Sequence, residues 1–173
     1  MKRHVALVGF MASGKTTIGR KLARKLHRPF CDTDALVVAD HGPIAAIFAN
    51  EGETAFRRYE SEAIHAALDR DEPSVIALGG GALTVAQNRR ILEERAYRIF
   101  IKVPAEQILA RVRRSREMRP VLGAAPTLEG IGALYQRRMA EYERADRVID
   151  VARRTDATVI AEIVGWLRGT VAQ

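Results

Sequence analysis

The sequence lacks several features that mark specialised classes of protein. Its 173 residues include one cysteine, Cys31, so an intrachain disulfide is impossible and a reducing, cytoplasmic location is expected. No apolar run is long enough to cross a bilayer, so we expect no membrane association. Histidine is scarce and has no metal-ligand spacing; we expect structural or surface roles for His4, His27, His41 and His65.

Aromatic residues make up only 6% of the chain, and acidic residues are fewer than basic ones, which leaves a net charge of +7. Such a charge fits either a nucleic-acid surface or a pocket for small anions. The arginines are scattered, and no aromatic residue that could stack on bases interrupts the one dense cluster, 111–119. We therefore favour the small-molecule pocket and expect no nucleic-acid partner. A content of 47% hydrophobic residues predicts one globular domain over 1–173.

The most informative motif is present near the beginning of the chain. Residues 9–16 match G-x-x-x-x-G-K-[ST], the phosphate-binding loop of nucleotide-binding proteins, at every fixed position. Gly9 and Gly14 let the backbone curl so that its N–H groups converge on phosphates. Lys15 adds an ammonium group, and Thr16 offers a hydroxyl to Mg²⁺. We expect ATP to be bound by Ala12, Ser13, Gly14, Lys15, Thr16 and Thr17.

Apolar runs of strand length alternate with segments of helical periodicity along the chain. Candidate strands are 5–8, 29–32, 74–78, 98–103 and 147–150. Candidate helices are 15–27, 34–40, 44–49, 53–68, 87–94, 105–113, 128–144 and 157–167. This alternation predicts an α/β fold with a parallel sheet covered by helices on both faces. The stretch 113–127 is rich in Arg, Gly, Ala and Pro, and we expect it to be a lid that closes over bound ligands.

Two acidic residues lie at the end of the second candidate strand, in Asp32-Thr33-Asp34. If this segment is extended, both carboxylates point the same way, toward the edge where open α/β sheets bind ligands. The third candidate strand ends in Gly79 without an acidic residue, so Asp32 is the candidate metal ligand, directly or through water. Asp34 remains for a substrate hydroxyl. The alternative is that both carboxylates only cap the next helix, and we assign that capping role to Thr33.

Two further sets of residues have a possible binding role. Gly79, Gly80 and Gly81 follow a candidate strand directly, which predicts close approach of the backbone to a bulky group and exposed N–H donors; a flexible loop is the alternative. Arginine binds carboxylates and phosphates through paired N–H groups. The candidates of this kind are Arg57, Arg119 and Arg138.

Together these motifs closely resemble those of the shikimate kinase family. The resemblance rests on 9–17, 32–34, Gly52-Glu53 followed by Phe56-Arg57, 79–82 and Arg119-Pro120, in the expected order over nearly the full length. It implies a five-stranded parallel sheet like that of nucleoside monophosphate kinases. It also implies transfer of the γ-phosphoryl group of ATP to the 3-hydroxyl of shikimate, within aromatic amino-acid biosynthesis. Val121 departs from the leucine that is commoner at its position in the family.

The resemblance also implies roles for single residues. Asp34 would bind the hydroxyls of shikimate, Arg57 and Arg138 its carboxylate, and Gly80 its ring substituents. Arg119 would reach the phosphates from the lid, so that Lys15, Asp34 and Arg119 form the catalytic set, with Mg²⁺ on Thr16 and Asp32. Arg154 would lie beside the adenine, although Arg111 and Arg113 compete for that role. We expect a monomer. Gluconate or a nucleoside monophosphate as acceptor, and a nucleic-acid-binding ATPase, remain alternatives.

Overall fold

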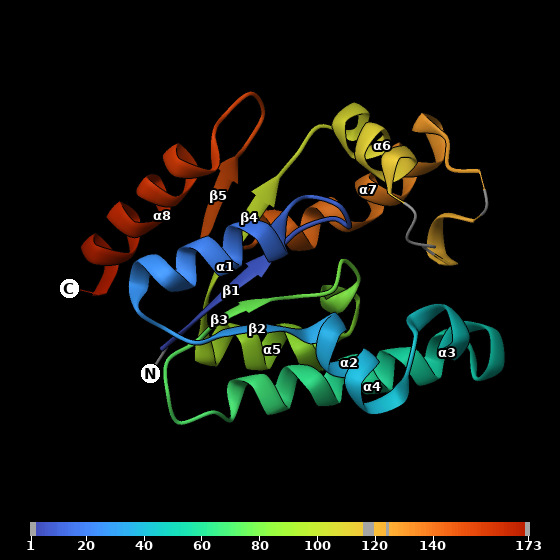
Figure 1. Ribbon diagram of the computed structural model, residues 1–173, viewed down its shortest axis with the longest axis horizontal. Coiled ribbons are helices and arrows are strands. Elements are labelled where there is room, and N and C mark those ends of the chain that lie inside the picture. Colours follow the sequence, from blue (N-terminus) through green and yellow to red (C-terminus); the bar gives the residue numbers. More distant parts are fainter. Residues whose placement is uncertain (1–2, 116–119, 124, 172–173) are drawn as a thin grey trace.

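Five parallel strands form one sheet in the order β2-β3-β1-β4-β5 (Figure 1). The computed structural model describes residues 3–115, 120–123 and 125–171. The strands are β1 (His4–Val8), β2 (Phe30–Asp32), β3 (Val75–Ala77), β4 (Ala96–Lys102) and β5 (Arg147–Asp150). β1 lies in the middle, where Val5 is in register with Val75 on one side and with Tyr97 on the other. The predicted parallel sheet is confirmed.

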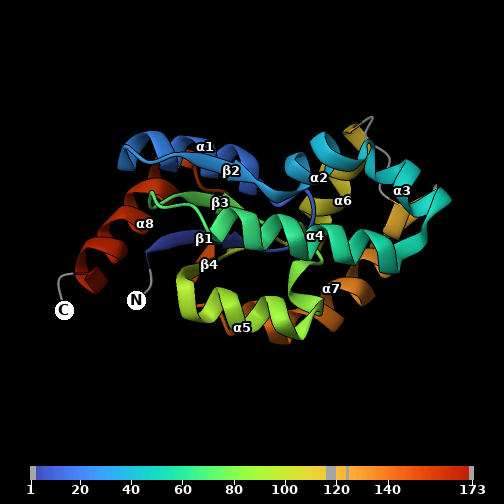
Figure 2. The same ribbon diagram turned by 90° about the horizontal axis from the view of Figure 1, so that it is seen from below.

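Helices connect these strands and cover both faces of the sheet. They are α1 (Lys15–Leu26), α2 (Thr33–His41), α3 (Ile44–Asn50), α4 (Gly52–Leu68), α5 (Ala86–Arg95), α6 (Ala105–Arg114), α7 (Leu128–Glu143) and α8 (Asp156–Val171), with short 3₁₀ helices η1 (Ala82–Thr84) and η2 (Pro120–Leu122). Figure 2 shows α1 and α5 on opposite sides of the sheet, and α8 packs beside α1. No helix among these described residues is long and apolar enough to span a membrane.

The strands β1, β3 and β4 are largely buried because most of their side chains are apolar on both faces, as a sheet covered on two sides requires, whereas the edge strand β5 is mostly exposed. Every residue from Val5 to Val8 is at most 1% exposed. Cys31 is buried in β2, as expected of a small strand residue. A second, smaller cluster joins α2, α3 and α4 through Val37, Ile47, Phe56 and Ala63. This second cluster gives the end of the molecule beyond β2 a core of its own.

The helix ends differ from the predicted bounds by a few residues, with a physical reason in two cases. α1 ends at Leu26 because His27 adopts a left-handed conformation with φ 53°, and its N–H bonds back to Ala23 and Arg24. α8 was expected to end at Leu167 and continues to Val171. Gly165 and Gly169 do not terminate α8, since a glycine within a helix lowers its stability by about 1 kcal/mol without breaking it.

We predict that Gly19→Val destabilises the protein by roughly 1–3 kcal/mol, the usual cost of overpacking. A Cβ atom at Gly19 would lie 2.6 Å from Cε2 of Phe30 and 3.3 Å from Cδ1 of Leu7. The matched control is Gly165→Val in α8, where a Cβ would meet no atom within 4 Å. Urea unfolding of both variants measures the difference. Equal stability of the two variants would show that Phe30 moves aside without cost.

Candidate active site

A cleft of about 770 Å³ opens at the carboxyl ends of the strands. Its walls come from the loop between β1 and α1, from the beginning of α2, and from the segment between β5 and α8. All the residues that the motif assigned to ATP line it, namely Ala12, Ser13, Gly14, Lys15, Thr16 and Thr17. Asp32, Asp34, Gly80, Arg111 and Arg154 line it too. The sheet therefore brings together residues that are up to 148 positions apart, from Met11 to Val159.

The loop before α1 has the conformation that phosphate binding requires. Gly14 caps α1 with φ 96°, a left-handed conformation that suits glycine. No side chain caps this helix, and its first turn contains no acidic residue, so no carboxylate of α1 itself offsets the positive end of the helix dipole at the cleft. The Lys15 ammonium donates to the carbonyl oxygens of Gly9 at 2.8 Å and Phe10 at 2.7 Å. These contacts hold the lysine along its own loop.

Asp32, the last residue of β2, connects this strand through its side chain to the beginning of α1. Its Oδ2 accepts a hydrogen bond from the Thr16 hydroxyl at 2.7 Å, while Oδ1 caps α2 by accepting from the backbone N–H of Asp34 and Ala35. Oδ1 therefore performs the capping role considered for this carboxylate, while Oδ2 contacts Thr16, the residue predicted to share the metal with it. Hydroxyl and carboxylate oxygens are the donors that Mg²⁺ prefers, and this pair fits an ion that keeps most of its water and phosphate ligands.

The expected extended geometry of 32–34 is wrong. α2 begins at Thr33, because the Asp32 carboxylate satisfies the N–H groups of its first turn. Thr33 also does not cap the helix as expected. Its hydroxyl donates to the carbonyl of Ala77 at 3.4 Å and accepts from the N–H of Gly79 at 3.1 Å, which ties α2 to the end of β3. Asp34 still faces the cleft, from the first turn of the helix.

A second, smaller cavity of about 90 Å³ adjoins the cleft. Both cavities are lined by Met11, Asp34, Ile44 and Gly80. The remaining walls of the small cavity are charged, apolar or glycine residues: Phe48, Phe56, Arg57, Glu60, Gly81, Pro120, Val121 and Arg138. The sequence-based candidates Asp34, Arg57, Gly80, Gly81 and Arg138 thus meet in one place. We call this cavity the acceptor pocket.

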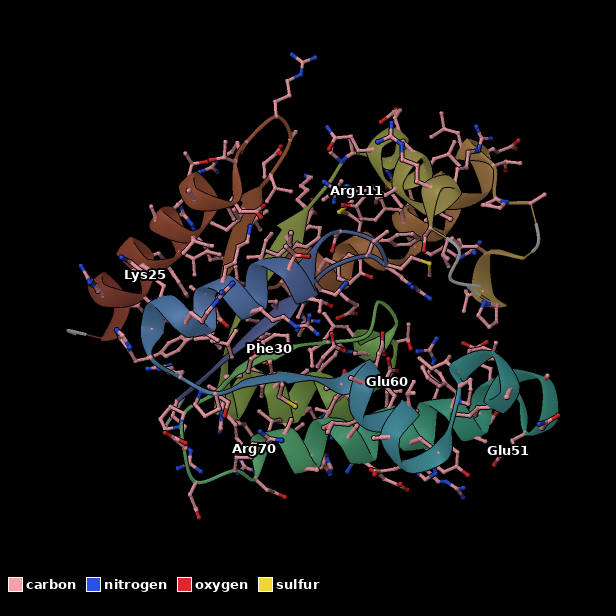
Figure 3. The ribbon with its side chains drawn as sticks, viewed as in Figure 1. Lys25, Phe30, Glu51, Glu60, Arg70 and Arg111 are labelled. Atoms are coloured by element: carbon pink, nitrogen blue, oxygen red, sulfur yellow. The ribbon has the colours of Figure 1, made fainter. Side chains whose placement is uncertain are left out.

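Arg57 is held by two acidic residues of its own helix. Its Nη1 donates to Oε2 of Glu60 at 2.7 Å, and its Nη2 donates to Glu53 at 2.9 Å. The Glu60 side chain is 1% exposed and that of Glu53 is 59% exposed, so the two ion pairs differ greatly in solvation. Burial raises the pKa of Glu60, and the neighbouring Arg57 opposes that rise. Figure 3 labels Glu60 on α4 and Arg111 across the site on α6.

The three glycines after β3 are positions of close approach, as predicted, and the groups that approach them belong to the protein itself. A Cβ on Gly79 would collide with the carboxylates of Glu60 and Asp34, and one on Gly81 with the guanidinium of Arg57. At Gly80 the obstacle would be the backbone N of Met11, at 2.9 Å. Side chains here would therefore displace the charged groups of the acceptor pocket.

Arg138 and Tyr142 lie one turn apart on α7 and both donate to the carbonyl oxygen of Gly80. The Arg138 guanidinium is 3.0 Å from that oxygen and lies over the ring of Phe10. Burial raises the pKa of Tyr142 to about 12, so its hydroxyl keeps its proton and remains a donor. Sequence reasoning missed Tyr142 and Glu60. Their helical spacing from Arg138 and Arg57 was the only available signal.

Two of the three arginines considered for the adenine side line the cleft. Arg111 donates to the carbonyl of Ala12 at 3.0 Å. Arg154 pairs with Glu162 at 2.7 Å, and the same carboxylate accepts from Arg147 of β5. Arg113 is exposed on α6 and is not among the residues that line the cleft. Arg119 and part of the expected lid, 113–127, lie outside the described residues, although Pro120 and Val121 reach the acceptor pocket.

Known proteins share this arrangement. The shikimate kinase family model matches residues 11–168. Shikimate kinases of Symbiobacterium thermophilum and Geobacter metallireducens are 42% and 37% identical, over 95% and 96% of this chain and 96% and 93% of their own. The solved shikimate kinase of Acinetobacter baumannii in complex with shikimate superposes with a TM-score of 0.92 at 31% identity, covering 98% of this chain and 95% of that one.

The chain belongs to the shikimate kinase family. The expected P-loop kinase fold, the identification with this family and the interpretation as an ATP-dependent phosphotransferase that acts on shikimate are confirmed. The comparisons do not test the roles of individual residues, and these remain predictions.

We predict that Glu162 stabilises the fold at neutral pH and loses that effect in acid. Hydrogen bonds from Arg147 and Arg154 lower the pKa of Glu162 below its ordinary 4.5. Its contribution is therefore complete above pH 4.5 and is lost as the pH falls through the lower folded-state pKa. Because the side chain is 30% exposed, we expect Glu162→Gln to cost only about 0.5–1 kcal/mol at pH 7.

Urea unfolding between pH 7 and pH 3 tests this, with Glu94→Gln, an exposed glutamate on α5, as the matched control. The difference between the parent and Glu162→Gln should shrink toward zero in acid. A difference that does not change with pH would assign the effect to packing.

Proposed function

We propose that the two adjoining cavities divide the reaction of the family between them, with ATP in the cleft and shikimate in the acceptor pocket. The supporting observation is that Asp34 and Gly80 line both cavities. An acceptor hydroxyl beside Asp34 would then face the loop that binds the phosphates. Holding two reactants in this relation accounts for much of the catalysis in phosphoryl transfer, where the protein has little covalent chemistry to do.

Positive charge for the transferred group comes from several elements. Lys15 and the amino end of α1 supply it at the phosphate-binding loop. Arg119, predicted to come from the lid at 113–127, adds a further guanidinium and helps to exclude water. Arg154, with Arg111 beside Ala12, borders the adenine end of the cleft. Ser13 and Thr17 complete the ATP-binding set.

Mg²⁺ is the proposed metal, with Thr16 and Asp32 as the residues that hold it. Among the described residues no group of three His, Cys, Asp or Glu side chains could enclose a metal ion. This fits Mg²⁺, which is usually bound through one or two protein oxygens together with water and substrate phosphates. When bound, the ion would neutralise charge on the phosphates; the protein contributes two oxygens already placed 2.7 Å apart.

Arg57 and Arg138 are proposed to bind the carboxylate of shikimate. Arg57 already has two carboxylate partners, and only the Glu53 partner is well exposed. Because an exposed ion pair is worth at most about 1 kcal/mol, the substrate carboxylate could replace Glu53 at little cost. Glu60 would keep its contact and hold the guanidinium in place. Asp34 would orient the reacting hydroxyl and accept its proton, with Gly79, Gly80 and Gly81 forming the adjacent wall.

The remaining proposals concern the protein as a whole. We propose a cytoplasmic monomer with one domain over 1–173, with a lid at about 113–127 and no nucleic-acid or membrane partner. The direct test of function is ADP release with shikimate, quinate, gluconate, AMP and polynucleotide as acceptors. We expect release with shikimate and at most slow release with the others. Faster release with any other acceptor would overturn the assignment of the acceptor pocket.

We predict that Asp32→Asn raises the Mg²⁺ concentration for half-maximal activity by about 10-fold or more, the usual effect of losing a partner of a metal site. The asparagine keeps an oxygen that can cap α2, so the fold should persist. Activity titrated with Mg²⁺ at saturating ATP gives the value. Asp40→Asn, at the exposed end of α2, is the control. An unchanged Mg²⁺ requirement would leave Asp32 with a capping role alone.

We predict that Arg57→Ala raises the KM for shikimate and leaves the KM for ATP nearly unchanged. Loss of one partner of a desolvated charge pair costs on the order of 2–5 kcal/mol. Arg57→Lys should restore little, because an ammonium group lacks the paired N–H fork. Arg58→Ala is the matched control, since Arg58 is exposed and pairs with Glu62 away from the pocket. Equal damage to both KM values would show that Arg57 faces phosphate.

A further inference from the structure

A third cavity, of about 260 Å³, lies between the η1–α5 segment and α7. Gly80 and Arg138 line both this cavity and the acceptor pocket, and within the described part of the chain they are the two lining residues that the cavities share. The other walls include Leu83, Arg89 and Tyr142. We call this cavity the α5–α7 pocket. The proposed ATP and shikimate sites account for Gly80 and Arg138 but give no role to the other walls of this cavity.

The charge of the α5–α7 pocket is strongly positive. Of the described residues that line it, Arg89, Arg137 and Arg138 have a guanidinium group and Glu141 alone has a carboxylate. Arg89 lies 3.3 Å from that carboxylate, and its Nη1 is fixed on the carbonyl of Leu83. In the described part of the chain, neither Arg137 nor Arg138 forms an ion pair. Among the described lining residues, Glu141 is thus the one carboxylate for three guanidinium groups, while the buried carboxylate of Glu60 attracts Arg138 from the side of the acceptor pocket.

Arg138 is the residue through which this pocket can affect the reaction. It is 92% buried, and one of its five N–H donors is used at the carbonyl of Gly80. Burying a cation with unused donors is costly, so an oxyanion that accepts from them is stabilised. The acceptor pocket offers one place for such an anion. The α5–α7 pocket offers a second place on the same guanidinium.

We propose that the α5–α7 pocket binds a small organic carboxylate with an apolar body, and that its occupation inhibits the enzyme by competing with shikimate for Arg138. Paired N–H groups of Arg137 and Arg138 would hold the carboxylate. Leu83 and the ring of Tyr142 give the pocket an apolar wall, which favours an organic acid over inorganic phosphate. The inhibition rests on the proposed function of Arg138, whereas the binding of the carboxylate does not.

Benzoate is a suitable probe. A substitution at Arg137 distinguishes the two pockets, because Arg137 lines the α5–α7 pocket and is not among the residues that line the acceptor pocket. Isothermal titration of the full chain with benzoate should give a Kd that Arg137→Gln weakens about tenfold. The inhibition constant of benzoate, measured against shikimate, should rise by the same factor. The kcat and the KM for shikimate of Arg137→Gln should stay within about twofold of the parent. Arg90→Gln, an exposed arginine of α5 outside the pocket, should behave as the parent.

Three results would overturn the proposal. Absence of benzoate binding removes the site, and equal benzoate affinity in the parent and Arg137→Gln places benzoate in the acceptor pocket. Inorganic phosphate that binds as tightly, with the same dependence on Arg137, overturns the organic carboxylate as ligand. A parent enzyme that releases no ADP with shikimate would instead contradict the proposed function, while the titrations would still report on the α5–α7 pocket.

Discussion

The position of β1 between two parallel neighbours is the constraint on which the active site depends. Because β3 and β4 run in the same direction on either side, the loops that follow all three strands meet at one edge. The loop after β1 is the proposed phosphate site, and Gly80 and Gly81 after β3 line the acceptor pocket. Complete burial of Val5–Val8 makes this register costly to change, since a slip by one residue would turn each side chain toward the opposite layer of helices, where the packing is shaped for another side chain. Core packing thus fixes the relative position of the two proposed binding sites.

Internal acceptors hold the cations of this site in place. Lys15 donates to the carbonyls of its own loop, Arg57 to Glu60 and Glu53, and Arg154 to Glu162. Each cation is therefore oriented before a ligand arrives, which lowers the ordering cost of binding. The opposing cost is that a ligand must compete with these partners. The exposure of Glu53 and Glu162 keeps that competition inexpensive, whereas buried Glu60 acts as a permanent support.

The parts that the sequence predicted are those governed by local rules. Alternating apolar strands and amphipathic helices gave the sheet and its covering layers, and the phosphate-binding motif located the cleft. The start of α2 was mispredicted because an extended segment was favoured, and metal binding and helix capping by Asp32 were treated as alternatives. One oxygen of its carboxylate caps α2 while the other contacts Thr16. Glu60 and Tyr142 were missed because their importance comes from burial and from contacts with Arg57 and Gly80. Such contacts arise only after α4 and α7 pack around the end of β3, and no local pattern encodes them.

Gly80 is the residue that the three cavities and helix α7 have in common. It lines all three cavities, and its carbonyl accepts from both Arg138 and Tyr142. Since the Tyr142 hydroxyl keeps its proton, the carbonyl of Gly80 still accepts one hydrogen bond when Arg138 turns away from it. The guanidinium can therefore turn toward an anion without leaving a buried carbonyl unsatisfied, which would otherwise cost about 1–3 kcal/mol. Tyr142 thus reduces the cost of using Arg138 as a ligand-binding group, in the acceptor pocket and in the α5–α7 pocket alike.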